Sequence, residues 1–480
     1  MKILYYNWIQ FDKKNNSGGG VNVYQKNVIE YLINNTEHEV YFLSSGIYYD
    51  LISKRIRIVE STNEFGKRCH TFKLINSTCM APVKAIYEDI DTYLIDMKVY
   101  QVFASFVKKY GFDVIHFNNI EGLPLNCLKI KRDFPEIKVV YSQHNYFMFC
   151  PQVNLFYNNS HTCEGCKNGI NCRECLAGSV SKSQFKNYYK LDTFLERVHL
   201  ETVSQKAKLF FKHLYLKKRG SSVQEVASES KASASIASAE DFKRYLKHNV
   251  GVLNKYVDSV LAVSDRAREI ALKNGVDKDK VHTVYVGTKV AEQAVKKYHG
   301  RTNYDYIVLG FMGYFEKLKG LEFLLNALER LPEELQNKVA FKCYAGRKTK
   351  EDDLLISRIK KLDESLVFSE YHDGYNHSEL PDIMKQIDLG VIPVLWEDNL
   401  PQVAIEFTAY GVPVLSSDLG GARELSKCDG FVFEAGNEED FIDKLKNIVT
   451  HSEMADEYFE GLMKPVTVEE HINNMFKYYV

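Results

Sequence analysis

The sequence has no excess of either charge, no long hydrophobic run and no recognisable secretion signal. Its 62 Lys and Arg residues balance 63 Asp and Glu residues, whereas proteins built around bulk nucleic-acid binding usually carry a basic excess. No run of about 18 apolar residues occurs, so no transmembrane helix is predicted. The first residues, MKILYYNWIQFDKKNN, hold only a short apolar run, and a secretory signal needs about 7–15 such residues. We therefore expect a cytoplasmic protein that does not bind nucleic acid.

Proline and tryptophan are scarce, with 10 and 2 residues, but the chain is 45% hydrophobic and 26% charged. That balance is typical of soluble globular proteins and excludes a wholly disordered or collagen-like chain. A length of 480 residues predicts roughly two to four domains. The ten cysteines do not suggest a secreted disulfide framework in so long a chain, although five of them gather between Cys150 and Cys175.

Apolar, β-branched segments alternate with helical patterns along most of the chain. A strand is predicted at Lys2–Tyr6, and helical spacing of apolar residues begins at Val21. Segments such as Phe112–Phe117 and Lys138–His144 are typical of buried parallel strands. The alternation predicts a doubly wound α/β fold, in which ligands bind at the carboxyl ends of the strands.

The alternation stops and resumes, which divides the chain. We expect an N-terminal Rossmann-like domain over residues 1–290, with a cysteine-containing insertion at about 147–250. A second α/β domain is expected over residues 303–465, and a last helix, 466–480, is expected to pack back on the first domain. The default ligand site is a cleft between the two domains.

The most informative segment is WEDNLPQVAIEFTAYGVPVLSSDLGG, residues 396–421. A predicted strand leads into a loop with carboxylates, and the helix that follows carries Glu406 in its first turns. Glu406 would be able to accept two hydrogen bonds from a vicinal diol such as a ribose. The alternative is a carboxylate that only stabilises the helix through its dipole.

This segment resembles the signature of the retaining glycosyltransferases of family 4, which have the GT-B fold. Asp398 and Glu406 are separated by seven residues, and GVPV and Gly420-Gly421 follow where the signature has them. The resemblance covers nearly the whole chain outside the insertion. It implies that Asp398, Asn399 and Leu400 orient sugar hydroxyls and phosphate, and that Glu406 binds the donor. Glu397 replaces Asp398 if the register slips by one residue.

A second matching motif is FMGYFEKLKGLEFLLNAL, residues 311–328. In the family, a Gly-Arg pair after this strand is followed by Lys-Gly at the start of a helix, and the Arg and Lys bind the donor diphosphate. Gly313, Lys319 and Gly320 match, but Tyr314 stands where the family has Arg. Tyrosine offers one hydroxyl and no charge, so the diphosphate is held more weakly, another cation substitutes, or the register is shifted.

Two further features lie at strand ends of the first half of the chain. Gly18, Gly19 and Gly20 form a loop after the first strand, where glycine permits a close approach to a ligand. In the resembled family this loop contacts the donor or the acceptor. His144 ends a predicted strand, and a His here lies near the anomeric carbon in the family. His116 also ends a strand and is the second choice.

The resemblance implies transfer of a sugar from a nucleotide-diphosphate sugar to a glycan or lipid-linked glycan, with retention of configuration, in cell-surface polysaccharide (capsule) biosynthesis. His144, Asp398 and Lys319 are the expected catalytic residues, and no catalytic metal is expected. Another GT-B enzyme, such as a nucleotide-sugar epimerase, is the enzymatic alternative. Because Tyr314 replaces the expected arginine, a third hypothesis is a subunit that binds a nucleotide sugar without catalysing transfer.

The cysteine cluster has metal-ligand spacing. Cys163, Cys166, Cys172 and Cys175 form C-x2-C-x5-C-x2-C, and two such knuckles are able to supply four thiolates to a structural zinc ion. Free thiols, a disulfide, or a redox or iron–sulfur role are the alternatives. The separation of the two pairs is shorter than in the usual zinc ribbon.

The balanced overall charge conceals one basic segment. Residues 181–219 hold 10 Lys or Arg and 3 Asp or Glu, a local net charge of +7, interleaved with aromatic and aliphatic residues. Such a segment is able to lie on an anionic membrane, which suits a peripheral enzyme on the inner membrane face that extends a lipid-linked glycan. The alternative is an amphipathic helix packed on its own domain.

Overall fold

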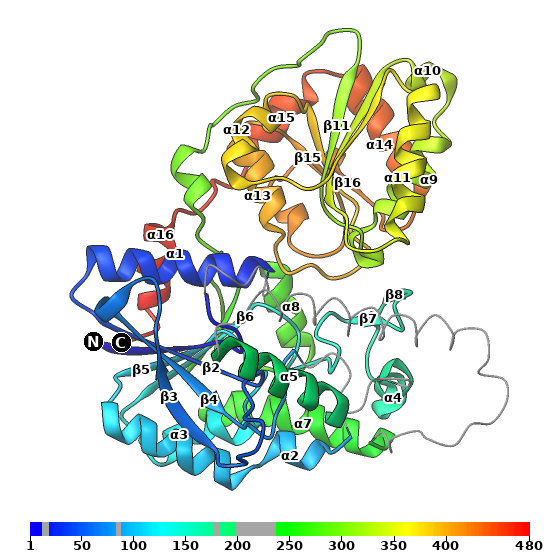
Figure 1. Cartoon of the computed structure of the whole chain (residues 1–480). Helices are drawn as coiled ribbons and strands as arrows, with labels where there is room; N and C mark the ends of the chain where they lie inside the picture. The colour runs from blue at the N-terminus through cyan, green and yellow to red at the C-terminus, as the bar shows by residue number, and fades with distance from the viewer. Residues whose placement is uncertain (12–18, 83–87, 177–181, 198–236) are drawn as a thin grey trace, which may run out of the picture.

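The computed structural model describes residues 1–11, 19–82, 88–176, 182–197 and 237–480. They form two α/β domains, each built on a sheet of mainly parallel strands (Figure 1). The doubly wound fold predicted from the sequence is therefore confirmed. Among the described residues, none of the helices combines the length and apolar character needed to span a bilayer. Gly18 and most of the basic segment, from residue 198 onward, lie outside the described residues.

The N-terminal sheet has the strand order β10-β9-β6-β5-β1-β2-β4-β3. Its strands are β1 (Lys2–Tyr6), β2 (Glu39–Ser45), β3 (Arg57–Ser61), β4 (Cys69–Ile75), β5 (Val114–Phe117), β6 (Lys138–Gln143), β9 (Ser259–Ala262) and β10 (Val281–Thr283). The central strands are almost wholly buried, as expected where helices cover both faces of a parallel sheet.

The edge of this sheet holds two strands that the sequence analysis does not name. β3 and β4 form an antiparallel pair there, and β3 is only partly buried. An antiparallel edge strand on an otherwise parallel sheet is common in such folds. Its weak apolar pattern explains why the sequence does not reveal it.

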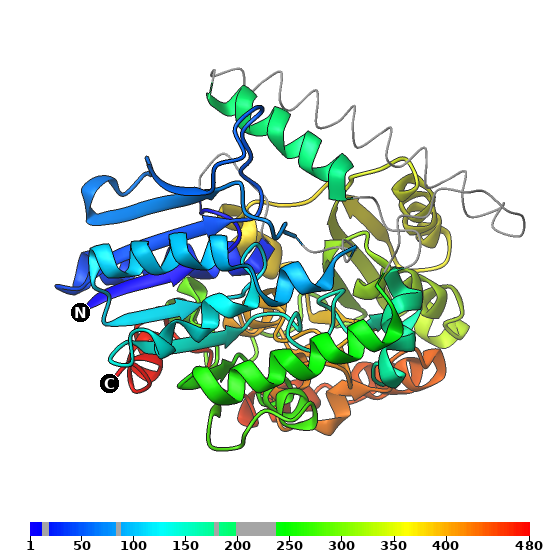
Figure 2. The ribbon, with the colours of Figure 1, turned by 90° about the horizontal axis from the view of Figure 1, so that it is seen from below.

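Helices cover the N-terminal domain on two sides. They are α1 (Gly19–Asn35), α2 (Ile90–Leu94), α3 (Met97–Tyr110), α4 (Ile170–Leu176), α5 (Lys182–Arg197), α7 (Ala239–Tyr256) and α8 (Asp265–Lys273). Figures 1 and 2 show α2, α3 and α7 along the side turned away from the C-terminal domain, whereas α1 lies toward it. The expected insertion holds α4, α5 and a short antiparallel pair, β7 (Phe156–Tyr157) and β8 (His161–Thr162).

The C-terminal sheet has the order β13-β12-β11-β14-β15-β16, and every pair in it is parallel. Its strands are β11 (Ile307–Tyr314), β12 (Val339–Gly346), β13 (Ser369–His372), β14 (Leu389–Ile392), β15 (Val414–Ser417) and β16 (Val432–Phe433). Its helices are α9 (Leu321–Glu329), α10 (Glu333–Gln336), α11 (Asp352–Lys361), α12 (Leu380–Met384), α13 (Gln402–Ala409), α14 (Glu438–Thr450) and α15 (Met454–Glu460).

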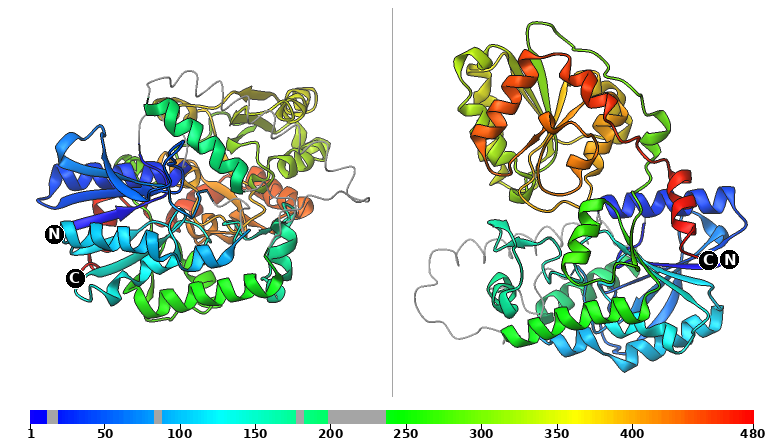
Figure 3. Two further views of the ribbon diagram at one scale, coloured as in Figure 1. Left: turned by 60° about the horizontal axis from the view of Figure 1, so that its bottom comes forward. Right: turned by 180° about the vertical axis from the view of Figure 1, so that it is seen from behind.

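The last helix, α16 (Val468–Phe476), crosses back to the N-terminal domain and lies beside α1 (Figure 3). His471 anchors this helix through both nitrogens of its ring. Nε2 lies 2.8 Å from the Tyr24 hydroxyl, and Nδ1 lies 2.7 Å from the Tyr285 carbonyl oxygen. Tyr479 continues the contact, with its hydroxyl 2.5 Å from His116 Nδ1. The two chain ends therefore meet within one domain.

Candidate donor site between the two domains

Lys319 is held by a tight turn at the carboxyl end of β11. Gly320 follows it with φ +74°, and a Cβ there would stand 1.6 Å from the carbonyl oxygen of Pro393. Only glycine fits this position, because it tolerates a positive φ and leaves room for the neighbouring backbone. The turn directs Lys319 Nζ to Asp398 Oδ2 at 2.6 Å, with Nζ also 5.4 Å from the centre of the Trp396 ring.

Asp398 is fixed by the two glycines that close its loop. Its carbonyl accepts a hydrogen bond from the Gly421 N–H at 2.9 Å. Gly420 has φ +72°, and a Cβ there would approach the Asp398 carbonyl oxygen to 2.1 Å. Gly420 and Gly421 are therefore needed for the close packing of the backbone in this loop. Asp398 is 8% exposed, and its carboxylate is the one that lies beside Lys319.

Glu397, the alternative to Asp398, points elsewhere. Its carboxylate pairs with the Arg266 guanidinium through two hydrogen bonds, at 2.9 and 2.5 Å, and accepts a third from the Gly420 N–H at 3.0 Å. Arg266 belongs to α8 of the N-terminal domain, so this pair joins the two domains. Sequence reasoning missed Arg266, and no local signal reveals a partner 131 residues away.

Glu406 lies one turn inside α13 and is buried. Its carboxylate lies 3.4 Å from His377 Nε2 and 3.4 Å from the Tyr375 hydroxyl. The hydrogen bond with Glu406 raises the pKa of His377 above its ordinary value, although burial opposes the shift. The dipole effect fades beyond the first turn of a helix, and that turn of α13 holds no acidic residue. A helix-stabilising role through the dipole is therefore a poor explanation of Glu406.

The start of α13 also contacts the N-terminal domain. Asn399 Nδ2 donates to the Gln143 carbonyl at 3.0 Å, and Gln402 Nε2 donates to the Gly20 carbonyl at 3.0 Å. Leu400, which lies between Asn399 and Gln402 in the sequence, is buried. Gly19, with φ +55°, is the first residue of α1, so the helix begins two residues before the expected Val21. Gly19 and Gly20 are thus at a helix N-terminus that meets the C-terminal domain.

His144 follows β6 at the same edge of the N-terminal sheet. Its Nε2 lies 3.2 Å from Asn118 Oδ1, and its ring is 4.6 Å from that of Tyr24. Burial, followed by the nearby His471, lowers the pKa of His144 to about 3, so the ring is neutral at neutral pH. His116 differs, because both of its ring nitrogens are engaged inside the core, with Tyr479 and with Ser142.

Tyr314 occupies the carboxyl end of β11 and is 46% exposed. It pairs in register with Gly346 of β12, just as Gly313 pairs with Ala345. The chain after β12 brings Lys348 Nζ to 3.9 Å from the centre of the Tyr314 ring, within the range of a cation–π contact. A cation therefore lies beside the position where the resembled family has arginine.

The four-cysteine zinc prediction finds no support in the structure. Cys163, Cys166, Cys172 and Cys175 are all free thiols. Within the described ranges, these four included, no three His, Cys, Asp or Glu side chains are grouped so that they could hold a metal ion. Cys163 Sγ instead donates to the Gly165 carbonyl, and Cys175 Sγ accepts from a backbone N–H. Burial raises the pKa of Cys172, which favours the thiol over the thiolate that zinc binds.

Comparison with known proteins relates the C-terminal domain to a family of transferases. The sequence profile of the family described as "Glycosyl transferases group 1" matches residues 306–451, most of the C-terminal domain. A protein of the cps region of Klebsiella pneumoniae is 26% identical over 39% of this chain and 50% of its own. A D-inositol 3-phosphate glycosyltransferase of Xylanimonas cellulosilytica is 28% identical over 34% of this chain and 41% of its own. The chain thus spans about half the length of the curated relatives it matches.

Solved structures resemble the whole chain. Sucrose-phosphate synthase from Thermosynechococcus elongatus superposes with a TM-score of 0.57 at 14% identity, covering 100% of this chain and 98% of that one. Anabaena Alr3699/HepE, in complex with UDP and glucose, superposes with a TM-score of 0.54 at 12% identity, covering 99% and 98%. At such identities the likeness shows the fold, which is the two-domain GT-B arrangement expected from the sequence.

Proposed function

We propose that this chain is a retaining glycosyltransferase of family 4, which transfers a sugar from a nucleotide-diphosphate sugar to a glycan or lipid-linked glycan. The observation that carries the proposal is the Lys319–Asp398 contact at 2.6 Å, on strand-end loops of the domain that matches the glycosyl transferase profile. Lysine at such a place suits the charge of a diphosphate, and the carboxylate holds it in position until the donor arrives.

The other residues of the site each bind a different part of the donor. Glu406, buried with only long contacts to its neighbours, has acceptor capacity for the two hydroxyls of a ribose. Tyr314 and Gly313 border the diphosphate, and Asn399 and Leu400 border the sugar. Gly19 and Gly20, at the N-terminus of α1, offer backbone N–H groups to anionic oxygens.

The transfer proceeds on one face of the sugar. The bond between the anomeric carbon and the phosphate oxygen breaks, the acceptor oxygen bonds to the same carbon, and the acceptor proton passes to the departing phosphate. Lys319 stabilises the charge on that phosphate. Neutral His144 positions the sugar or acceptor hydroxyl, and no catalytic metal takes part.

Two relatives support a biological setting for the proposed activity. The Klebsiella pneumoniae relative is named for its cps region, and a second relative is a D-inositol 3-phosphate glycosyltransferase. We place this chain in cell-surface polysaccharide synthesis, such as a capsule, on the inner membrane face.

The test is acceptor-dependent release of nucleoside diphosphate, measured over a panel of UDP-, GDP- and ADP-sugars and glycan acceptors. Wild-type protein should release nucleotide only when donor and acceptor are both present. Glu406→Gln should abolish release, and Glu364→Gln, an exposed carboxylate of the same domain, should not. Donor binding without any release across the panel would instead identify a nucleotide-sugar-binding subunit.

A further inference from the structure

A stripe of like charge runs along α5 of the N-terminal domain. Lys182, Lys186, Lys190 and Phe194 follow one another at intervals of four residues, so they share one face of the helix. Lysines at this spacing repel each other and destabilise a helix unless an anion lies near them.

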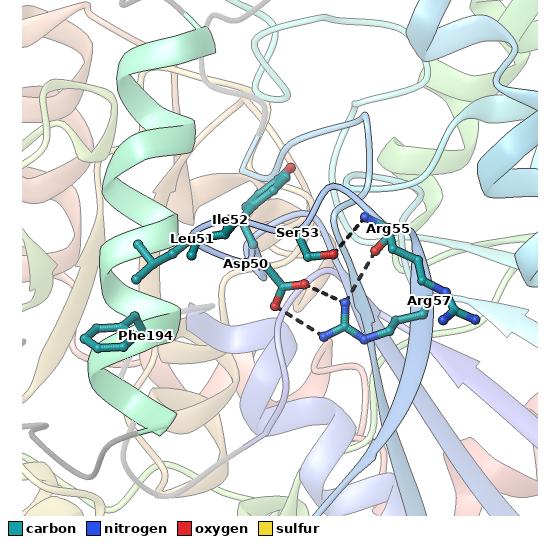
Figure 4. A pocket seen from close by; sticks show the side chains of 8 residues that line it. Asp50, Leu51, Ile52, Ser53, Arg55, Arg57 and Phe194 are labelled. Atoms are coloured by element: carbon teal, nitrogen blue, oxygen red, sulfur yellow. Dashed lines mark hydrogen bonds and ion pairs between the residues drawn. The ribbon is translucent and has the colours of Figure 1, made fainter.

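The loop between β2 and β3 faces this stripe. Lys186 Nζ lies 5.2 Å from the centre of the Tyr49 ring, and Phe194 lines a cavity of about 550 Å³ together with Leu51 and Ile52 (Figure 4). The loop has a fixed base, because Asp50 pairs with Arg57 through two hydrogen bonds, at 2.5 and 3.2 Å. The Tyr49 backbone N–H also donates to Thr193 Oγ1 at 3.2 Å, which joins the base of the loop to α5.

Few carboxylates offset the lysines of this region: the Glu88 carboxylate accepts a hydrogen bond from the Lys182 backbone N–H at 2.8 Å, and Asp192 lies on the same helix. In the part of the chain that the structure describes, Lys54, Lys182, Lys186 and Lys190 form no ion pair. Burial and the charges of Lys182, Lys190 and Lys54 lower the pKa of Lys186, because nearby positive charges disfavour its protonated form. A second groove, of about 780 Å³, continues the positive surface with Lys54, Arg55, Lys98 and Lys109.

Apolar side chains stand exposed among these cations. Ile52 is 92% exposed, Leu51 44% and Phe194 41%. Exposed aliphatic and aromatic side chains do not help to bind a small soluble anion. At a membrane they insert into the interface, beside cations that contact lipid phosphates.

We propose that this basic-apolar face, made of Leu51–Arg55 and the Lys182–Phe194 stripe, docks the protein on a bilayer of anionic phospholipid. The loop follows the carboxyl end of β2, and His144 follows the carboxyl end of β6 in the same parallel sheet. A membrane at this face therefore lies on the side of the N-terminal sheet where His144 follows β6, which suits a lipid-linked acceptor. In this respect the inference rests on the proposed function.

The test is flotation of the full-length protein with vesicles of phosphatidylcholine alone or with phosphatidylglycerol. Wild-type protein should float only with the anionic vesicles, and added salt should weaken binding. Ile52→Ser/Phe194→Ser removes the apolar contacts, and Lys54→Glu/Lys190→Glu reverses two charges. The charge reversal should lower the partition coefficient at least about tenfold, since each cation near the surface contributes about fivefold. The apolar pair should also lower it, because binding strength scales with the apolar area buried in the interface. Lys54→Gln/Lys190→Gln should have a smaller effect.

The matched control is Leu354→Ser/Lys360→Glu, which makes the same kinds of change on exposed residues of α11, and should float like wild type. Turnover with a water-soluble acceptor should be unchanged in every variant, which separates this inference from the proposed function. Equal flotation of the variants and wild type, or equal binding to neutral vesicles, would overturn it. Release from vesicles by inorganic phosphate at low, constant ionic strength would also overturn it, and would indicate a soluble-anion site.

Discussion

Replacing Lys319 by Met leaves Asp398 without its cation. At an effective dielectric constant of about 20, two unit charges 2.6 Å apart attract each other by about 6 kcal/mol. Desolvation offsets much of this, and breaking a buried pair costs about 3–5 kcal/mol. The Lys319 side chain is 26% exposed, so we expect the lower limit, about 3 kcal/mol. For a domain of this size the loss corresponds to roughly 6–12 °C in Tm.

The double variant Lys319→Met/Asp398→Asn separates stability from function. It removes both charges, so most of the lost Tm should return, whereas sugar transfer should stay about 10²–10³-fold below wild type in both variants. Differential scanning fluorimetry and nucleotide release measure the two effects, with Lys317→Met, an exposed neighbour, as the control. If Lys319→Met kept wild-type Tm and turnover, or if the double variant regained activity, the reasoning would be refuted.

Three further changes test other parts of the site. Gly320→Ala should lower the Tm of the C-terminal domain and abolish donor binding, since its Cβ would meet a carbonyl oxygen at 1.6 Å; an unchanged Tm by fluorimetry would contradict the turn geometry. The pKa values of His144 and His471 are lowered to about 3 and about 4, so stability should fall as pH drops below about 6.5, by up to about 1.4 kcal/mol per pH unit for each ring. Urea unfolding at pH 7 and 5 measures this, and equal stabilities would refute it. Glu406 raises the pKa of His377, so the stability that the His377–Glu406 contact contributes is fully present below about pH 6.5 and is lost as pH rises through the raised pKa. His377→Gln should remove that part of the pH dependence of stability. A variant whose stability depends on pH as the wild type's does would exclude the contact.

The sequence predicts features that have a local pattern or motif, and misses contacts between segments in which one partner has no motif. The strand at Lys2–Tyr6 forms as predicted, because a buried parallel strand has a clear apolar pattern. The two motifs assign Lys319 and Asp398 to the same donor, and the structure brings their side chains together, since both follow strands whose carboxyl ends share one edge of the sheet. Arg266, by contrast, has no motif, and its role depends on how the two domains pack.

Some sequence features proved ambiguous for physical reasons. The spacing of Cys163 to Cys175 is compatible with zinc, but spacing fixes neither the side-chain directions nor the backbone contacts that the thiols make instead. Tyr314 breaks the resemblance to the family at one position, and only the structure reveals Lys348 beside it. The edge strand β3 has too little burial to give a periodic signal.

The central claim is that the Lys319–Asp398–Glu406 group binds a nucleotide-diphosphate sugar. A thermal-shift titration with UDP-, GDP- and ADP-sugars tests it most directly. At a hundredfold excess over Kd, one donor should stabilise the wild-type protein by about 2.7 kcal/mol, a rise of several degrees in Tm, and the rise should vanish in Glu406→Gln and Lys319→Met. A panel that leaves the wild-type Tm unchanged, or a shift that persists in both variants, would contradict the account.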